Sequence, residues 1–278
     1  MPARTDAFSS DGFVVVRDAI APDVVRSCVE AIEDELGRHA VDPRDRTTWT
    51  EPVVRLACPE GPAFAEAGTS PALRAAYDEL LGPGRWIRRE GVGGTLPVRF
   101  PSLREPGDAG WHIDGSFDVD GAWWANVRSR GRGLLALFLF TDVSDDDAPT
   151  ELIVGSHLDV PRVLAPFGER GVFYGDVVPH LARFTFERPR ARATGRAATS
   201  SSATRFSFIA QRGRIAAADR AWWLSRGWRS RSHSRCASVP ACIPSSTRSC
   251  AASGRGRRDS RPAASRCGRS VFELRSRA

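Results

Sequence analysis

A continuous apolar run near the middle of the chain, residues 133–140 (GLLALFLF), constrains the fold more than any other segment. The run begins with a glycine and is soon followed by the acidic turn at residues 145–147. Such a run is typical of a β-strand that is buried on both faces, because a strand with one solvent-exposed face alternates apolar and polar residues. A short buried helix has the same composition, and the sequence leaves both alternatives open.

The segments on either side of this run predict helices first and strands afterwards. Residues 22–37 begin with Pro22, which suits the first turn of a helix, and repeat apolar residues at helical spacing. Residues 71–81 predict a second helix, with Ser70 as its N-terminal cap. Helices followed by many short strands predict a mainly β (α+β) fold, with a helical layer on a jelly-roll barrel. Such strands are expected at residues 13–16, 98–100, 111–114 and 152–154.

The composition changes sharply near residue 198. Residues 198–278 contain 17 Ser, 17 Arg and 14 Ala and lose the apolar periodicity, which is typical of disorder. These 81 residues have 17 Arg and only three acidic residues, a charge of +14, so the net charge of +7 for the whole chain leaves residues 1–197 acidic, at −7. We therefore expect a folded domain over residues 1–197 and an irregular tail over residues 198–278.

Compartment and membrane contact can also be judged from the sequence. No apolar stretch reaches the roughly 18 residues that a membrane span needs, and the first residues lack the order of a signal peptide. Cys28 and Cys58 are the only cysteines in residues 1–197, which favours a reducing compartment. We expect a cytoplasmic protein without a membrane partner.

His112 and Asp114 are the main candidates for chemistry. Two residues that are two apart on an extended strand point to the same side, so this imidazole and this carboxylate would share one face. They supply two of the three ligands of a facial iron(II) site, which leaves positions open for oxygen and a co-substrate. The alternative is a chance His-x-Asp pair with a structural histidine.

The motifs around this pair resemble those of the phytanoyl-CoA dioxygenase family, and they cover about residues 7–197. The resemblance implies a double-stranded β-helix that binds iron(II) through His112 and Asp114. It also implies 2-oxoglutarate as co-substrate, with ascorbate as an accessory reductant. The motifs occur in the family's order at residues 11–15 (DGFVV), 111–114 (WHID), 137–143 (LFLFTDV), 147–150 (DAPT) and 155–157 (GSH).

The resemblance further implies the reaction, in which decarboxylation of 2-oxoglutarate to succinate accompanies hydroxylation of a small organic substrate. Asp114 favours hydroxylation, since related halogenating enzymes lack this carboxylate. The far carboxylate of 2-oxoglutarate pairs with a basic residue in the family. Arg99 and Thr150 are candidates for binding it, and the alternatives are an exposed strand arginine and a threonine that supports a turn.

Two further aromatic or imidazole features have ordinary structural interpretations. His157 is expected to satisfy backbone groups at the end of a strand. Trp123 and Trp124 either line a substrate mouth or pack against neighbours.

The family pattern also requires a Gly-Asp pair, a His about 95–100 positions after the first ligand, and an Arg about ten positions further on. The chain lacks these residues in frame. If the last base of each codon is read with the first two bases of the next, residues 198–209 are compatible with GDVFLCHPFLVH. The codon that straddles Phe208 and Ile209 then reads only His or Tyr. We hypothesise a frameshift that removed the third ligand and the 2-oxoglutarate arginine.

Two in-frame histidines remain as substitutes for the third ligand. His180 ends the segment GDVVPH, but it follows His112 too closely and suits an ordinary surface histidine. His233 lies in Ser/Arg-rich sequence without a strand pattern.

Three functions therefore stay open. The first is an iron(II)/2-oxoglutarate oxygenase, impaired in this version. The second is a non-catalytic barrel that binds a small ligand. The third is a binder of nucleic acid or other anions through the arginine-rich tail, which has neither a basic helix nor zinc-finger spacing. We expect a small-molecule substrate rather than a nucleic acid.

Overall fold

The structure is a computed structural model that describes residues 4–108, 110–114, 117–128, 134–204, 207, 209–211 and 221–227. Its α-helices are α1 (Arg4–Asp11), α2 (Pro22–Arg38), α3 (Pro62–Gly68), α4 (Pro71–Leu81), α5 (Val160–Leu164) and α6 (Tyr174–Thr185). Short 3-10 turns are η1 (Arg46–Thr48), η2 (Ser156–Leu158) and η3 (Ala165–Phe167). The strands are β1 (Phe13–Val16), β2 (Val53–Ala57), β3 (Thr95–Arg99), β4 (Gly110–His112), β5 (Phe117–Val119), β6 (Ala122–Ala125), β7 (Leu134–Leu139), β8 (Glu151–Ile153), β9 (Val172–Phe173), β10 (Arg190–Arg192), β11 (Ser200–Thr204), β12 (Ile209–Gln211) and β13 (Ala221–Gly227).

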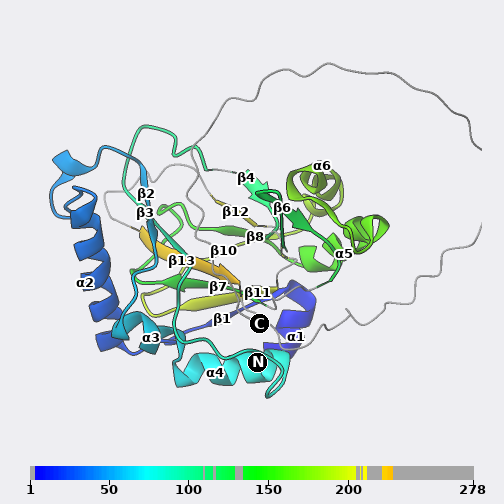
Figure 1. Cartoon of the computed structure of the whole chain (residues 1–278), viewed down its shortest axis with the longest axis horizontal. Helices are drawn as coiled ribbons and strands as arrows, with labels where there is room; N and C mark the ends of the chain where they lie inside the picture. The colour runs from blue at the N-terminus through cyan, green and yellow to red at the C-terminus, as the bar shows by residue number, and fades with distance from the viewer. Residues whose placement is uncertain are drawn as a thin grey trace, which may run out of the picture. The chain divides into compact units, whose positions relative to one another are not determined.

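The strands form antiparallel sheets in which distant parts of the chain alternate (Figure 1). The largest sheet has the order β1-β11-β7-β13-β3-β2, and a four-stranded sheet has the order β10-β8-β12-β4. A small sheet, β5-β6-β9, completes the arrangement. Because β7 lies between β11 and β13, strands from late in the sequence interleave with earlier ones, as in a jelly roll. The predicted mainly β fold with N-terminal helices is confirmed.

Strand β7 is buried on both faces, as the apolar run predicts. Ala136 and Phe138 belong to the core beneath the helices, whereas Leu135 and Leu137 belong to the core between the two larger sheets. This alternation has the period of two that defines a strand. The alternative of a buried helix is therefore wrong.

Helices α2, α3 and α4 cover the outer face of the six-stranded sheet (Figure 1). Their apolar stripes supply residues such as Ile32 and Leu73, both fully buried, to the core that contains Phe138. Ser70 caps α4 as predicted, because its hydroxyl oxygen accepts a hydrogen bond from the Leu73 amide at 3.2 Å.

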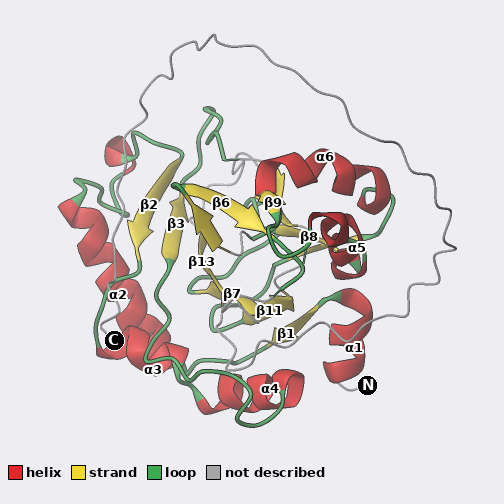
Figure 2. Cartoon of the chain, turned by 45° about the vertical axis from the view of Figure 1, so that its right-hand side comes forward, coloured by secondary structure: helices red, strands yellow, loops and turns green. Residues whose placement is uncertain are grey.

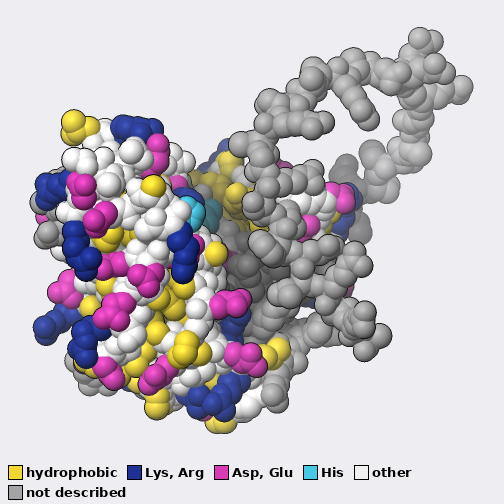
Figure 3. Space-filling view, turned by 60° about the vertical axis from the view of Figure 1, so that its left-hand side comes forward, with side chains coloured by type: hydrophobic (Ala, Val, Ile, Leu, Met, Phe, Trp, Pro, Cys, Tyr) yellow, Lys and Arg dark blue, Asp and Glu magenta, His cyan; other side chains and the backbone are white. Residues whose placement is uncertain are grey.

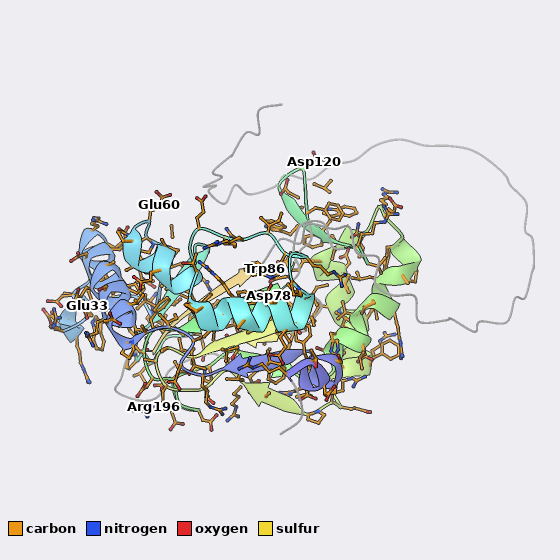
Figure 4. The ribbon with its side chains drawn as sticks, turned by 90° about the horizontal axis from the view of Figure 1, so that it is seen from below. Glu33, Glu60, Asp78, Trp86, Asp120 and Arg196 are labelled. Atoms are coloured by element: carbon orange, nitrogen blue, oxygen red, sulfur yellow. The ribbon has the colours of Figure 1, made fainter. Side chains whose placement is uncertain are left out.

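The segment after α4 is tied back onto that helix. The indole Nε1 of Trp86 donates to Oδ1 of Asp78 at 2.8 Å, and the two side chains lie together in Figure 4. The face that carries α2 shows acidic and basic side chains interspersed around apolar ones (Figure 3). That face therefore lacks the large single-sign field that steers a nucleic acid.

Helices α5 and α6 cover the other face of the four-stranded sheet (Figure 2). Val177 and Leu181 of α6 pack against Ile113 and Ile153 in a third core cluster. One face of β4, the strand that ends at His112, therefore packs toward α6. No helix within the described ranges is long and apolar enough to cross a membrane.

The described strands extend past the expected domain boundary at residue 197. Strand β11 follows it directly and pairs with both β1 and β7, while β12 and β13 pair with strands of the two larger sheets. The folded part thus includes segments that we expected to be irregular. Residues 228–278, which hold the rest of the expected tail, lie outside the described residues.

Candidate metal centre

Strand β4 directs His112 toward the interior between the two larger sheets. His112 is the direct cross-strand partner of Ile209 on β12. Ile209 is 2% exposed and belongs to the core between the sheets. Because opposite residues of an antiparallel pair project from the same face, His112 faces this interior as well. Its neighbours Trp111 and Ile113 pack instead in the cluster beneath α6.

The ring of His112 is oriented by its own strand. Its Nδ1 lies 3.1 Å from the carbonyl oxygen of Gly110. When Nδ1 carries the proton and donates to this carbonyl, Nε2 keeps its lone pair and can bind a metal. A backbone carbonyl behind a ligating imidazole is a common way to fix its tautomer and orientation.

Asp114 lies two residues beyond the end of β4 and is half-buried. Ile113, which stands between it and His112, is 1% exposed and packs toward α6. That His112 and Asp114 share one face stays a prediction.

An aliphatic side chain lies opposite His112, where the predicted iron site needs its third ligand. Among the residues that the structure describes, no group of three His, Cys, Asp or Glu residues lies close enough to hold a metal ion. Ile209 stands across from His112, at the position where the shifted reading frame reads His or Tyr. An aliphatic group cannot donate to a metal, so the described residues do not complete a three-ligand iron site.

His180 is not brought to His112. It lies on α6, where Val177 and Leu181 form the face that packs toward Ile113, and His180 itself is exposed on a groove beside α5. The sheet separates this groove from the interior that His112 faces. The other substitute, His233, lies outside the described residues.

Arg99 is buried in an ion pair instead of exposed on its strand. It is 1% exposed, and its Nη2 lies 2.5 Å from Oδ2 of Asp108. The same Oδ2 accepts from Nη2 of Arg55 at 2.5 Å. Burial lowers the pKa of the Arg99 guanidinium, and the Asp108 carboxylate opposes that shift. Arg99 therefore has an internal carboxylate as its partner.

The sequence by itself does not single out Asp108. Asp108 stands just before the strand that carries His112 and joins the β3–β4 connection to both β2 and β3 through the two arginines. Glu105 and Asp108 both lie in this Pro/Gly-rich connection, and the sequence does not reveal which basic residues either of them meets. Only the pairing of β2 with β3 brings Arg55 and Arg99 to the same carboxylate.

Thr150 and His157 lie around strand β8. Thr150 is 2% exposed, and its carbonyl oxygen accepts from the Ala193 amide at 2.8 Å. The Nε2 of His157 lies 3.0 Å from the carbonyl oxygen of Ser9, which agrees with the structural role expected for this histidine. A Cβ on Gly12 would lie 2.4 Å from its Nδ1, so the motifs DGFVV and GSH meet where only glycine fits.

Trp123 and Trp124 are neighbours on β6, between β5 and β9. Trp124 pairs with Phe117 and Phe173, whereas Trp123 is 46% exposed. The two rings alternate across the strand, so one of them packs and the other faces outward.

Comparisons with known proteins show the fold. No protein-family model matches the sequence, and no curated protein sequence matches it. Among solved structures, the chain is similar to the non-heme alpha ketoglutarate dependent epimerase SnoN from nogalamycin biosynthesis, with a TM-score of 0.56 and 15% identity over 81% of this chain and 79% of that one.

Two further structures have the same fold. EctD from S. alaskensis with bound Fe matches with a TM-score of 0.51 and 19% identity, over 81% of this chain and 76% of that one. HygX from Streptomyces hygroscopicus, with nickel, 2-oxoglutarate and hygromycin B bound, matches with a TM-score of 0.50 and 15% identity, over 82% of this chain and 87% of that one. The chain thus has the jelly-roll fold of these iron and 2-oxoglutarate enzymes.

Proposed function

We propose that this chain carries the scaffold of a cytoplasmic iron(II)/2-oxoglutarate-dependent oxygenase that hydroxylates a small organic substrate, in a version whose metal centre is incomplete. One observation supports the proposal: His112, on a strand of the jelly roll, lies opposite the buried Ile209, and the carboxylate of Asp114 follows two residues later in the chain. The fold supports iron(II) and 2-oxoglutarate as the groups for which the scaffold is built, and the motifs support the phytanoyl-CoA dioxygenase family. Among the described residues the donor set lacks a third ligand, so this version would hold iron(II) weakly.

Strand β11 supports the frameshift. Ser200 and Ser202 are fully buried, and their hydroxyl oxygens have no hydrogen-bond partner among the described residues. The shifted frame reads Val and Leu at these two positions. Apolar side chains suit a strand that lies between β1 and β7, whereas an unsatisfied buried hydroxyl costs about 1–3 kcal/mol.

Sequencing the gene across codons 190–210, from an independent isolate of the same DNA, tests this hypothesis. We expect the shifted frame, with a His codon in place of the codons of Phe208 and Ile209. If an independent isolate has the present frame at every codon, the frameshift is not a sequencing error. The protein experiment below then tests whether a natural frameshift removed the third ligand.

The substitution Ile209→His tests the metal centre. It puts an imidazole opposite His112, and we expect anaerobic cobalt(II) or iron(II) binding to tighten by at least about 100-fold, because a third protein ligand completes the facial set. Isothermal titration calorimetry and the visible absorption of cobalt(II) measure this change.

Two variants control the experiment. Ile209→Phe introduces a ring of similar size without a ligand nitrogen, and it should leave metal binding as weak as in the unchanged chain. The double variant Ile209→His with His112→Ala should lose the gain. If Ile209→His and Ile209→Phe bind cobalt(II) equally, the proposed centre is wrong.

A non-catalytic barrel is the alternative that the aliphatic Ile209 favours. The unchanged chain should release little succinate from 2-oxoglutarate under either function. Iron-dependent succinate release that appears only in the Ile209→His chain would favour the oxygenase scaffold, and its absence there would favour the non-catalytic barrel. The arginine-rich tail lies largely outside the described residues, and nothing in the described part favours nucleic-acid binding.

A further inference from the structure

A groove between α5 and α6 has a volume of about 420 Å³, within the range of small-molecule sites. Residues of α5 and the turn η3 line one side of the groove and residues of α6 line the other; Figure 2 shows α5 and α6 next to each other. It is separate from the His112 side of β4, because α6 meets that strand through Val177 and Leu181. The groove is lined by Asp159, Arg162, Val163, Pro166, Phe167, His180 and Phe184.

Two aromatic rings dominate the walls of the groove. Phe184 is 64% exposed and Phe167 is 38% exposed, so each presents a large apolar surface to water. With Val163 and Pro166 they make a mostly apolar lining. A ligand with a flat or aliphatic body would remove this surface from water, which is favourable in proportion to the apolar area covered.

The charge at the groove is positive. The one carboxylate of the lining, Asp159, is held by Arg188, whose Nε and Nη2 donate to its two oxygens at 2.6 and 2.9 Å. Arg162 is exposed and makes no ion pair within the part of the chain that the structure describes. The neutralised aspartate and the unengaged guanidinium favour an anionic group on the ligand.

We propose that this groove binds a small carboxylic acid with an aromatic or aliphatic body. The carboxylate pairs with Arg162, and the body lies between Phe167 and Phe184. The inference does not depend on the proposed oxygenase function, because none of these residues belongs to β4 or β12.

The experiment titrates the full chain with 2-naphthoate and, in parallel, with the neutral 2-naphthamide, by isothermal titration calorimetry. Naphthoate should bind more tightly than naphthamide by about fivefold, the size of an exposed ion pair. Arg162→Gln should remove this difference by weakening naphthoate alone. Phe184→Ala should weaken both probes by about tenfold, because it removes most of one wall.

Arg183→Gln is the matched control for Arg162→Gln, since Arg183 is exposed on α6, carries the same charge as Arg162 and does not line the groove. It should change neither affinity. These exposed substitutions should leave the circular dichroism and melting temperature unchanged. Equal binding of the two probes, equal effects of Arg162→Gln and Arg183→Gln, or loss of naphthoate binding in His112→Ala would each overturn the proposal.

Discussion

Two buried serine hydroxyl groups lower the stability of this fold. Ser200 and Ser202 lie on β11, between β1 and β7 of the six-stranded sheet, where Val16 is the cross-strand partner of Ser200 and Ala136 that of Ser202. Their hydroxyls give up water and gain no hydrogen bond within the described residues. We expect Ser202→Ala to raise the free energy of unfolding by about 1–2 kcal/mol. Urea denaturation measures this change.

Replacing Ser70 by alanine should change the free energy of unfolding in the opposite direction. Its hydroxyl accepts from the Leu73 amide at 3.2 Å and donates to the carbonyl oxygen of Ala19. Ser70→Ala should therefore lower the free energy of unfolding by about 1 kcal/mol. If Ser202→Ala and Ser70→Ala destabilise the protein equally, the Ser202 hydroxyl forms a hydrogen bond in the folded protein in solution, and the prediction for Ser202 is wrong.

His157 makes stability depend on pH. Burial lowers its pKa below the ordinary 6.5, so the folded chain keeps the imidazole neutral where the unfolded chain protonates it. The unfolded state then binds more protons as the pH falls, and the stability present above pH 6.5 is lost progressively toward the folded pKa.

His157→Gln should reduce this pH dependence while costing about 1 kcal/mol at pH above 7 through the altered contact with Ser9. Urea denaturation at pH 7.5 and at pH 5.5, in both chains, provides the comparison. An identical loss of stability in the variant would assign the pH dependence to other groups.

Among the elements, the connection between β3 and β4 is held by one carboxylate. Asp108 joins the buried Arg99 and the exposed Arg55, and it precedes the strand that carries His112. Asp108→Asn should destabilise the protein by about 3 kcal/mol, because it leaves the buried guanidinium without its charged partner. Arg55→Gln removes only the exposed partner and should cost less than about 1 kcal/mol.

Thermal and urea unfolding of the two variants measure this difference. In the Ile209→His chain, Asp108→Asn should also weaken cobalt(II) binding, since β4 loses its anchor. Equal stabilities of the two variants would show that Arg99 finds another carboxylate.

For the whole molecule, the late strands decide whether the sheets close. A chain that ends at residue 197 lacks β11 and β13, the two strands that pair with β7, and it lacks β12, which pairs with β4. We expect that chain to lose cooperative unfolding. A chain that ends at residue 227, the last residue of β13, should retain it.

Circular dichroism during urea denaturation, with size-exclusion chromatography, compares the two truncated chains with the full one. Cooperative unfolding of the shorter chain would restore the boundary expected at residue 197.

The sequence by itself determined the local elements. The period of apolar residues, Pro22 and the Ser70 cap specify helices close to their observed bounds, and the apolar run specifies a strand buried on both faces. These features depend on neighbours along the chain, which a sequence displays directly. The motif at His112 likewise predicted, from the same local regularity, that His112 and Asp114 share a face.

Only the tertiary structure decided the long-range pairs. It put Ile209 opposite His112, brought Asp108 to Arg99, and separated His180 from the metal-ligand strand. It also built β11 and β13 into the sheet on either side of β7, although their composition predicts irregular structure. Backbone pairing and burial against distant strands override weak local preference, because strand formation depends on its neighbours in space more than on its own side chains.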